Sequence, residues 1–357
     1  MANFNKIAVL CNYELLPERV GGMDHFYWLF DKKCKDNGIE VDWFFPNLSA
    51  HGGYSDLNLH SSNYGNVEQY FLNNYSSNDY SHIFTHFIEL CTPFYKKIKK
   101  VNQAKIITID HNPRPLSGYP LKKRLEKKAK GLLYSKYIDL FVGVSDYTVN
   151  EILKDFGSSL KRKSITIYNG VITDTIKERK QRNFDAPTFL VASHLRKSKG
   201  IQDLISAVGL LSNEMQRKIV IDVYGDGPYR TKLENQVATL GLTSNFVFKG
   251  SVANLNEIYC NYDYMLQPTY MECFSLSILE SLAANVPVIT TNVGGNEEAV
   301  SHGENGIIFK PKDVTKLAAV LEALISQEIK IEQNTRTAIA ARFSIETMVE
   351  NYFKLLP

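Results

Sequence analysis

The sequence predicts an α/β protein of two doubly wound domains, each built on a parallel sheet covered by helices. Short apolar runs rich in β-branched residues alternate with helical stretches along the chain, which is typical of parallel sheets. The chain has 357 residues. That is more than the roughly 250 to 300 residues at which one hydrophobic core splits into two. With 44% hydrophobic and 22% charged residues, each half can bury a core of its own.

The expected strands of the first half are residues 6–11, 41–45, 82–87, 105–110, 139–145 and 164–170, with helices such as 24–37 and 148–156 between them. The second half repeats the pattern with strands at 188–193, 218–225, 246–250, 263–269, 287–291 and 306–309. Ligands of such sheets bind at the carboxyl ends of the strands, so functional residues are expected just after them.

The two halves are expected to be Rossmann-like domains that face each other. Residues 173–187 interrupt the apolar pattern with charge and end in proline, which predicts an interdomain linker. We therefore expect an N-terminal domain over residues 1–178 and a C-terminal domain over residues 179–342. Residues 343–357 are expected to form a helix that returns toward the N-terminal domain.

Several classes of protein are disfavoured by the composition. The five cysteines include no Cys-x-x-Cys pair, so neither a disulfide framework nor a thiolate zinc site is indicated. The apolar run near the N-terminus has five residues, too few for the core of a signal peptide. A cytoplasmic protein fits both observations. His82 and His86 have no third ligand nearby in sequence and no Asp-x-Asp occurs, so no metal or other cofactor is expected.

Positive charge is concentrated in residues 96–136, which hold thirteen Lys or Arg against two acidic residues. Within this segment, apolar residues recur at helical spacing opposite four lysines: Leu121, Leu125, Ala129, Leu132 and Leu133 opposite Lys122, Lys123, Lys127 and Lys130. An amphipathic basic helix of this kind suits an anionic membrane surface. It equally suits a solvated helix packed on its own domain. No nucleic-acid motif accompanies the charge, so nucleic acid is not an expected partner.

Two loops after expected strands combine glycine or cations with the start of a helix. Gly21 and Gly22 would let backbone N–H groups approach an anion, although a plain turn is an equal alternative and the Gly-x-Gly-x-x-Gly pattern of dinucleotide sites is missing. Arg196 and Lys199 lie three residues apart, where two cations could clamp a diphosphate. A polar loop with solvated cations is the alternative. The turn at residues 225–228 is by itself only a tight turn.

The segment from Glu272 to Glu280 is the most informative. Ser275 or Ser277 can cap a helix whose first amides point at a ligand, with Glu272 in the loop before it and Glu280 inside it. Carboxylates in these positions can accept hydrogen bonds from sugar and ribose hydroxyls on either side of a phosphate. The competing interpretation is a capping box of Ser277 and Glu280, with Glu280 purely structural. Asn285 follows the helix and is expected to end it in a left-handed conformation.

At this point the chain resembles the retaining glycosyltransferases of the GT-B fold, specifically the large family four (GT4). The segment MECFSLSILESLAANVPVITT is similar to the family's Glu-x7-Glu motif. Further elements agree in order: Gly21-Gly22, His111, Val144-Ser145, Asn169-Gly170-Val171, Arg196 with Lys199, Gly225-Asp226-Gly227-Pro228, Gly294-Gly295 and Asn305-Gly306. Three positions depart from the family pattern, namely His194, Ser275 and Asn285.

The resemblance implies roles for individual residues. Glu272 would contact the donor sugar, Glu280 the nucleotide ribose, and Arg196 with Lys199 the donor diphosphate. It further implies that His111 reaches the donor sugar, that Val252 lies near the base, and that backbone amides of Gly22, Phe274, Ser275 and Leu276 bind the phosphates. Catalysis would thus rest on Glu272, His111, Arg196 and Lys199.

The implied reaction is the retaining, metal-independent transfer of a hexosyl unit from a nucleotide-sugar. A UDP-sugar is the first expectation for the donor and a GDP-sugar the next. The acceptor would be a glycan or lipid-linked sugar bound in the N-terminal half, in cell-surface polysaccharide or glycolipid synthesis. The enzyme would then work in the cytoplasm or peripherally on the inner face of the membrane. The alternatives are a nucleotide-sugar epimerase or hydrolase of the same fold and a non-catalytic partner subunit.

Overall fold

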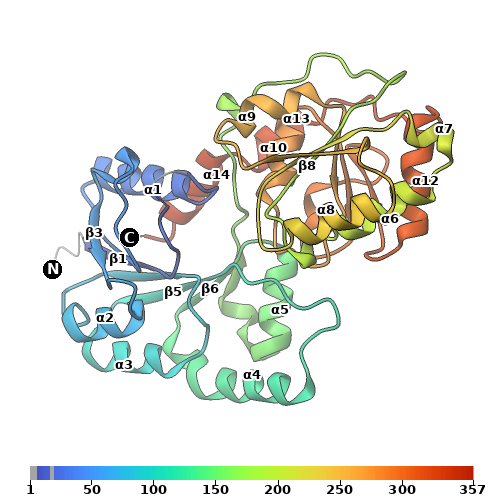
Figure 1. Cartoon of the computed structure of the whole chain (residues 1–357). Helices are drawn as coiled ribbons and strands as arrows, with labels where there is room; N and C mark the ends of the chain where they lie inside the picture. Colours follow the sequence, from blue (N-terminus) through green and yellow to red (C-terminus); the bar gives the residue numbers. More distant parts are fainter. Residues whose placement is uncertain (1–5, 17–19, 357) are drawn as a thin grey trace. The chain divides into compact units, whose positions relative to one another are not determined.

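The computed structural model describes residues 6–16 and 20–356, and the chain divides into two compact units (Figure 1). The N-terminal unit comprises residues 1–169 together with 345–357, and the C-terminal unit comprises residues 170–344. Within the described residues, each unit contains one sheet in which all strand pairs are parallel, as the alternation of strands and helices predicted.

The sheet of the N-terminal unit has the strand order β3-β2-β1-β4-β5-β6-β7. Its strands are β1 (Lys6–Cys11), β2 (Glu40–Phe45), β3 (Asn58–Ser61), β4 (His82–His86), β5 (Lys105–Asp110), β6 (Leu140–Gly143) and β7 (Ser164–Thr166). The helices of this unit are α1 (Asp24–Asp36), α2 (Val67–Asn74), α3 (Pro93–Val101), α4 (Leu121–Tyr134), α5 (Asp146–Phe156) and α14 (Ile345–Phe353). Asn66 and Ser145 cap α2 and α5, because their side chains accept the third amide of each helix.

The sheet of the C-terminal unit has the order β10-β9-β8-β11-β12-β13. Its strands are β8 (Phe189–Ala192), β9 (Ile221–Tyr224), β10 (Phe246–Gly250), β11 (Tyr264–Gln267), β12 (Val288–Thr291) and β13 (Gly306–Phe309). Its helices are α6 (Ile201–Leu210), α7 (Asn213–Gln216), α8 (Arg230–Thr239), α9 (Leu255–Ile258), α10 (Leu276–Ala283), α11 (Asn296–Ala299), α12 (Val314–Ile325) and α13 (Arg336–Arg342).

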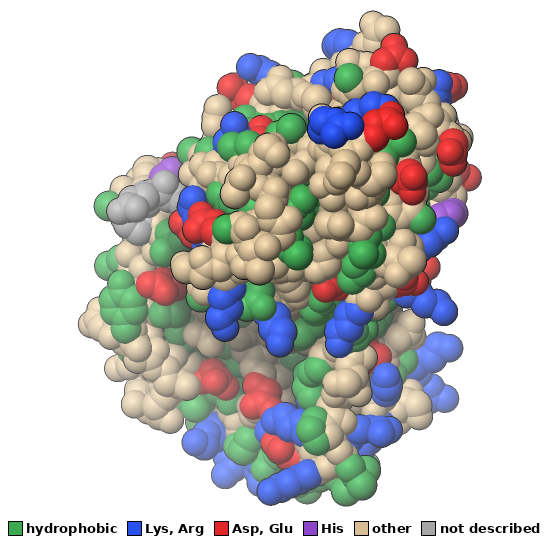
Figure 2. Space-filling view, turned by 45° about the vertical axis from the view of Figure 1, so that its right-hand side comes forward, with side chains coloured by type: hydrophobic (Ala, Val, Ile, Leu, Met, Phe, Trp, Pro, Cys, Tyr) green, Lys and Arg blue, Asp and Glu red, His purple; other side chains and the backbone are tan. Residues whose placement is uncertain are grey.

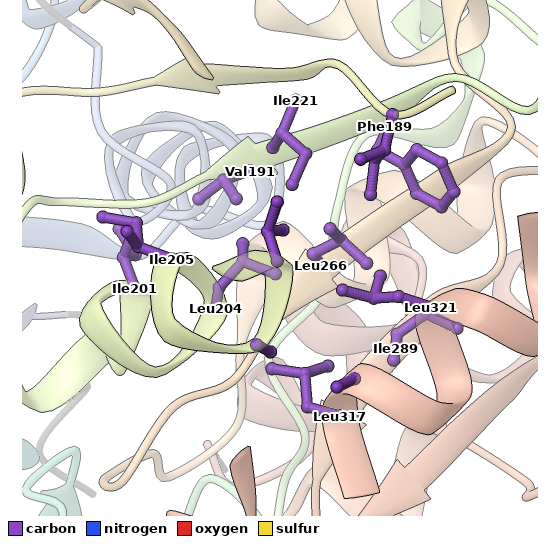
Figure 3. Close-up of a cluster of buried hydrophobic side chains, with 14 of the residues drawn as sticks. Phe189, Val191, Ile201, Leu204, Ile205, Ile221, Leu266, Ile289, Leu317 and Leu321 are labelled. Carbon is purple, nitrogen blue, oxygen red and sulfur yellow. The ribbon is translucent and has the colours of Figure 1, made fainter. Parts of the chain in front are cut away.

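The core of the C-terminal unit shows why its strands are apolar on both faces. In Figure 3, Val191, Leu266 and Ile289 from neighbouring strands lie against Leu204 of α6 and Leu321 of α12. All five side chains are at most 1% exposed. Helices cover a parallel sheet on both sides, so its strands form continuous hydrophobic runs. Because all strand pairs of this sheet are parallel, the carboxyl ends of its strands lie at the same edge.

The structure corrects the prediction that residues 173–187 link the two domains. The change of unit falls between Asn169 and Gly170, not at residue 178, and the segment that follows is fastened to the C-terminal unit. Arg179 forms an ion pair with the fully buried Asp263 at 2.6 Å. Arg182 donates to both the carbonyl oxygen and Oδ1 of Asn285, at 3.0 and 2.6 Å. These contacts span 84 residues or more of sequence, so local composition could not reveal them.

At the other end of the chain, α14 belongs to the N-terminal unit and packs on α1 (Figure 1). Tyr352 is fully buried, and its ring centroid lies 4.8 Å from that of Phe26. Lys33 and Glu350 add an ion pair of 3.1 Å.

Helix α4 forms where the basic helix was predicted, and it packs on its own unit through Lys127 rather than through its leucines. Lys127 is buried whereas Leu121, Leu125 and Leu132 are exposed. Two of the lysines reach acidic side chains elsewhere in the N-terminal unit: Lys127 pairs with Asp155 at 3.1 Å, and Lys130 pairs with Glu89 at 2.7 Å.

Candidate active site

The carboxyl ends of β8 and β11 carry an oppositely charged pair of side chains. Lys199 ends the short 3-10 helix η5 (Lys197–Lys199) after β8, and Glu272 lies in the loop after β11. Lys199 Nζ is 2.7 Å from Glu272 Oε2, with side-chain exposures of 21% and 15%. Salt screens the attraction between two charges that are partly withdrawn from water less than it screens the attraction within a surface pair. The structure thus brings together two of the predicted catalytic residues.

Gln267, the buried last residue of β11, connects this pair with helix α10. Its Nε2 donates to Glu272 Oε2 at 3.2 Å and to Ser275 Oγ at 3.0 Å. Ser275 is the N-cap of α10, and its Oγ accepts from the amide of Ile278 at 3.5 Å. Gln267 is a site residue that was not predicted, although a polar residue at the end of an apolar strand is a visible signal in the sequence.

The start of α10 therefore lies beside the ion pair. Phe274, Ser275 and Leu276 occupy the last loop positions and the first helical position. Phe274 is buried, and its ring packs at 5.2 Å from that of Phe343. The first amides of a helix have no acceptor within the helix, so this end of α10 is suited to a phosphate.

Two glycines allow the loops around Glu272 to approach each other closely. A Cβ at Gly200 would lie 1.8 Å from the carbonyl oxygen of Pro268, and one at Gly294 would lie 2.0 Å from that of Glu272. Both glycines also have positive φ, 72° and 62°. The loop that carries Glu272 is thus held between the loops that follow β8 and β12.

Glu280 lies inside α10 and meets a buried tyrosine. Tyr259 OH donates to Glu280 Oε2 at 2.9 Å. Burial of the carboxyl raises the pKa of Glu280 from its ordinary 4.5 to about 7, and the hydrogen bond from Tyr259 opposes that rise. Ser275, not Ser277, is the N-cap. The capping-box interpretation of Ser277 and Glu280 is therefore wrong, and Glu280 offers a carboxyl group that titrates near neutrality.

Arg196 and Val252 lie in neighbouring loops of the C-terminal unit. The Arg196 side chain is exposed and has no ion pair within residues 6–16 and 20–356. Its loop is held by the turn after β9, because Leu195 N donates to the carbonyl oxygen of Asp226 at 2.9 Å. A Cβ at Gly225 would lie 1.9 Å from a backbone oxygen of that loop. Val252 follows β10 and is half-buried.

Gly22 lies in the N-terminal unit, in the exposed loop before α1. The carboxylate of Asp24, 2% exposed, orders this loop by accepting from Gly21 N at 2.7 Å and from Tyr13 OH at 3.2 Å. Tyr54 OH also donates to Asp24. Asp24 was not predicted, because no sequence signal distinguishes it from other residues of a first helical turn.

His111 follows β5 in the same unit and forms a pair with His86 of β4. His86 Nδ1 and His111 Nε2 are 3.0 Å apart, and the Phe87 ring stacks on His111 at 4.2 Å. Burial lowers the pKa of His111 to about 4 and that of His86 well below its ordinary value. Both rings are therefore neutral at pH 7, and one ring donates to the other. His86, first considered as a metal ligand, instead orients His111.

The predicted site residues thus fall into two sets: Gly22 and His111 in the N-terminal unit, and Arg196, Lys199, Val252, Glu272, Phe274, Ser275, Leu276 and Glu280 in the C-terminal unit. Among the residues with described positions, no three His, Cys, Asp or Glu side chains group as metal ligands would. The described helices also include none that is long and apolar enough to cross a bilayer.

Comparison with known proteins finds a family whose model the C-terminal unit resembles. Residues 173–342 match the family of glycosyl transferases group 1. N-acetyl-alpha-D-glucosaminyl L-malate synthase of Bacillus anthracis is 30% identical over 163 residues, 45% of this chain and 42% of that protein. 2-Deoxystreptamine N-acetyl-D-glucosaminyltransferase of Niallia circulans is 27% identical over 173 residues, 47% and 44% of the two chains. This chain spans less than half the length of these two relatives.

Solved structures match over nearly the whole chain. Alr3699/HepE of Anabaena, crystallised in complex with UDP, has a TM-score of 0.78 at 17% identity and covers 98% of this chain and 99% of its own. WaaG, described as a glycosyltransferase involved in lipopolysaccharide biosynthesis, has a TM-score of 0.69 at 15% identity and coverages of 98% and 99%. These likenesses, together with the two parallel sheets, show the GT-B fold that the sequence predicted.

Proposed function

We propose that this chain, whose residues 173–342 match the family of glycosyl transferases group 1, is a retaining hexosyltransferase that uses a nucleotide-sugar donor. The observation that carries the proposal is the ion pair of Lys199 and Glu272 beside the start of α10. Within one loop cluster, the cation and the first amides of the helix can bind the phosphates of a sugar diphosphate, and the carboxylate can bind the hydroxyls of its sugar.

The Lys199–Glu272 pair would exchange partners when the donor binds. Lys199 Nζ would move to a phosphate oxygen, which leaves the Glu272 carboxylate to accept hydrogen bonds from sugar hydroxyls. Arg196, exposed and without an ion pair in the described residues, would add a second cation at the diphosphate. Placing positive charge where negative charge develops is the largest electrostatic contribution that an enzyme makes to such a transfer.

Glu280 would accept hydrogen bonds from the ribose diol, because its carboxyl lies one turn inside the helix that receives the phosphates. Tyr259 holds this carboxyl at 2.9 Å. Val252 would lie near the base, and the amides of Phe274, Ser275 and Leu276 would contact the phosphates. From the N-terminal unit, Gly22 would contribute a backbone amide and His111 a neutral ring facing the donor sugar.

In the reaction, the bond between the anomeric carbon and the diphosphate oxygen breaks as the acceptor oxygen bonds to the same face of that carbon. The acceptor proton passes to the departing phosphate oxygen, so configuration is retained and no protein base is required. Lys199 and Arg196 would stabilise the leaving diphosphate. We also propose that catalysis needs no metal, since these cations and the helix amides supply positive charge to the phosphates.

The donor proposed first is a UDP-sugar, and a GDP-sugar is proposed next. The UDP complex of Alr3699/HepE and its complex with UDP-glucose support this order. The proposed acceptor is a glycan or lipid-linked sugar of a cell-surface polysaccharide or glycolipid. WaaB, described as a lipopolysaccharide outer core galactosyltransferase, has a TM-score of 0.74 and supports this class. The proposed location is the cytoplasm, with peripheral attachment to the membrane.

The test begins with binding of UDP, GDP and their sugars, measured as shifts in thermal unfolding, followed by product analysis with glycan and lipid-linked acceptors. NMR of the product's anomeric proton reports retention, and added EDTA tests metal independence. Lys199→Ala and Glu272→Ala are each expected to lower turnover by on the order of 100-fold or more. Lys197→Ala, two residues away and exposed, is the matched control. Near wild-type turnover in either active-site variant contradicts the assignment.

Two other results would redirect the proposal. Release of nucleotide from the donor at an undiminished rate without any acceptor indicates a hydrolase or epimerase. Binding of donor without turnover on any acceptor indicates a non-catalytic subunit.

A further inference from the structure

Helix α4 exposes its leucines. Leu121, Leu125, Leu132 and Leu133 are 68%, 61%, 83% and 59% exposed. At 3.6 residues per turn, the first three of them fall on one face of the helix. Single exposed leucines are ordinary, whereas leucines aligned on one helix face form a candidate surface for another molecule.

The rotation of α4 about its axis is fixed by contacts on its opposite face. Lys127 pairs with Asp155 at 3.1 Å and lies over the rings of Tyr119 and Phe156, at 4.7 and 4.9 Å from their centroids. A Cβ at Gly131 would lie 2.0 Å from the carbonyl oxygen of Phe156, so only glycine allows this close approach. The cation and the glycine therefore face the protein, and the leucines are left outside.

Cations flank the leucine stripe, and Lys128 lies within it, between Leu125 and Leu132. Lys122, Arg124 and Lys128 of α4 are exposed and form no ion pair within the described part of the chain. The neighbouring helix α3 adds exposed Lys96 and Lys97. The exposed acid of α4, Glu126, is paired with Lys130 at 2.8 Å and Lys123 at 3.4 Å. Figure 2 shows Lys and Arg side chains among hydrophobic ones along the lower edge of the molecule, where α4 lies in Figure 1.

We propose that α4 docks on an anionic bilayer, with its leucines inserted at the boundary between lipid headgroups and tails and its free cations among the headgroups. Apolar residues flanked by lysine and arginine are the composition of helices that lie in the membrane interface. The cations complement the negative potential of anionic lipids. The proposal rests on the peripheral attachment proposed above, for which it names the residues, and it does not depend on the donor site, so its failure leaves glycosyl transfer untouched.

The size of the stripe favours a bilayer over a second copy of the chain. Fourteen residues of helix extend about 21 Å, and a face about 10 Å wide then offers about 200 Å². A stable protein interface buries about 800 Å² on each partner. Unpaired cations on both copies would also repel each other across a symmetric contact.

The test is co-sedimentation of the full chain with vesicles. One set contains phosphatidylcholine with roughly 30% phosphatidylglycerol, and the other phosphatidylcholine alone. We expect the chain to sediment with the anionic vesicles at low salt and to be released at about 1 M salt, where the Debye length falls to about 3 Å. Equal binding to both vesicle types, or to neither, overturns the proposal.

Apolar insertion is tested with the double variant Leu125→Ser and Leu132→Ser. We expect its partition coefficient to fall by on the order of tenfold or more, since each buried methylene favours the lipid. The matched control is Leu210→Ser with Leu240→Ser, two leucines that are 61% and 47% exposed in the C-terminal unit. Equal losses in the two double variants contradict a specific role of α4. Because all four side chains are exposed, folding should persist, and circular dichroism verifies it.

The charge contribution is tested with Lys122→Gln plus Lys128→Gln against Lys310→Gln plus Lys316→Gln, exposed lysines of the C-terminal unit. Only the α4 pair should weaken binding to anionic vesicles.

The fluorescence of a variant Leu132→Trp reports how deeply α4 inserts into the bilayer. The chain has two native tryptophans, so the wild type provides the background emission. A blue shift of the added emission with anionic vesicles supports insertion, and its absence overturns it. Size-exclusion chromatography completes the test. A dimer that the Leu125→Ser and Leu132→Ser variant dissociates, with unchanged vesicle binding, would replace the bilayer by a second copy.

Discussion

The raised pKa of Glu280 predicts how the stability of the C-terminal unit depends on pH. The perturbation is Glu280→Gln, which keeps the shape and a hydrogen-bond acceptor for Tyr259 but removes the titrating group. In the folded protein burial raises the pKa of Glu280 from 4.5 to about 7. Below pH 4.5 the carboxyl is protonated in both the folded and the unfolded state, so it favours neither.

Between pH 4.5 and 7 the unfolded chain releases this proton while the folded unit retains it. The free energy of unfolding therefore falls as pH rises through this window, and the loss is complete above pH 7. A rise of the pKa from 4.5 to about 7 corresponds to about 3 kcal/mol, because one pKa unit is worth about 1.4 kcal/mol. This value is an upper limit, since Glu280 is only half-buried.

The assay is urea unfolding of wild type and variant at pH 5 and pH 8, followed through the transition of the C-terminal unit, because a protein of two units need not unfold in one step. We expect the variant to gain up to about 3 kcal/mol relative to wild type on going from pH 5 to pH 8. Glu322→Gln, an exposed glutamate on α12, is the control and should show no such gain. Parallel pH dependences for wild type and Glu280→Gln would refute the reasoning.

Three further predictions concern the loops, helix α4 and the donor. Gly200→Ala should lower the free energy of unfolding of the C-terminal unit by several kcal/mol, because the added Cβ would lie 1.8 Å from a backbone oxygen. Gly241 has a similar φ of 68° but open space around it, so Gly241→Ala should cost only about 1 kcal/mol in the same urea unfolding measurement. Lys127→Ala should destabilise the N-terminal unit by about 1–3 kcal/mol, whereas Lys128→Ala on the exposed side should change its thermal unfolding little. If Glu280 binds the ribose diol as a carboxylate, UDP affinity measured by calorimetry should rise between pH 6 and pH 8 in wild type and stay flat in Glu280→Gln; a flat wild-type curve contradicts that role.

The fold could be predicted from the sequence because its strands are short continuous apolar runs separated by helices. Strand β3 was missed, since NLHS holds one strongly apolar residue and borders the sheet. The sequence left open which face of α4 packs against its own unit. Periodicity defines two faces but not which of them meets the protein, and here the buried Asp155, 28 residues away, draws Lys127 inward.

Glu280 shows which part of the site the sequence left open. Its spacing from Ser277 fits a capping box, and only the position of the N-cap at Ser275 excludes that interpretation. The partner of its carboxyl, Tyr259, lies in a different loop with no motif of its own. Local pattern could therefore locate the residue but not its environment, and the environment sets its pKa.

The pair of Lys199 and Glu272 changes how both predicted roles are understood. Taken separately, a lysine after one strand and a glutamate after another are two independent ligands for two parts of a donor. At 2.7 Å each neutralises the other before any ligand arrives, and neither bears an uncompensated charge in a partly buried site. A donor that offers phosphate to the lysine and hydroxyls to the carboxylate replaces one contact with two. A nucleotide that lacks the sugar would engage the lysine and leave the carboxylate to Gln267, which already donates to it at 3.2 Å. We therefore expect the pair to favour ligands that carry both a diphosphate and a sugar.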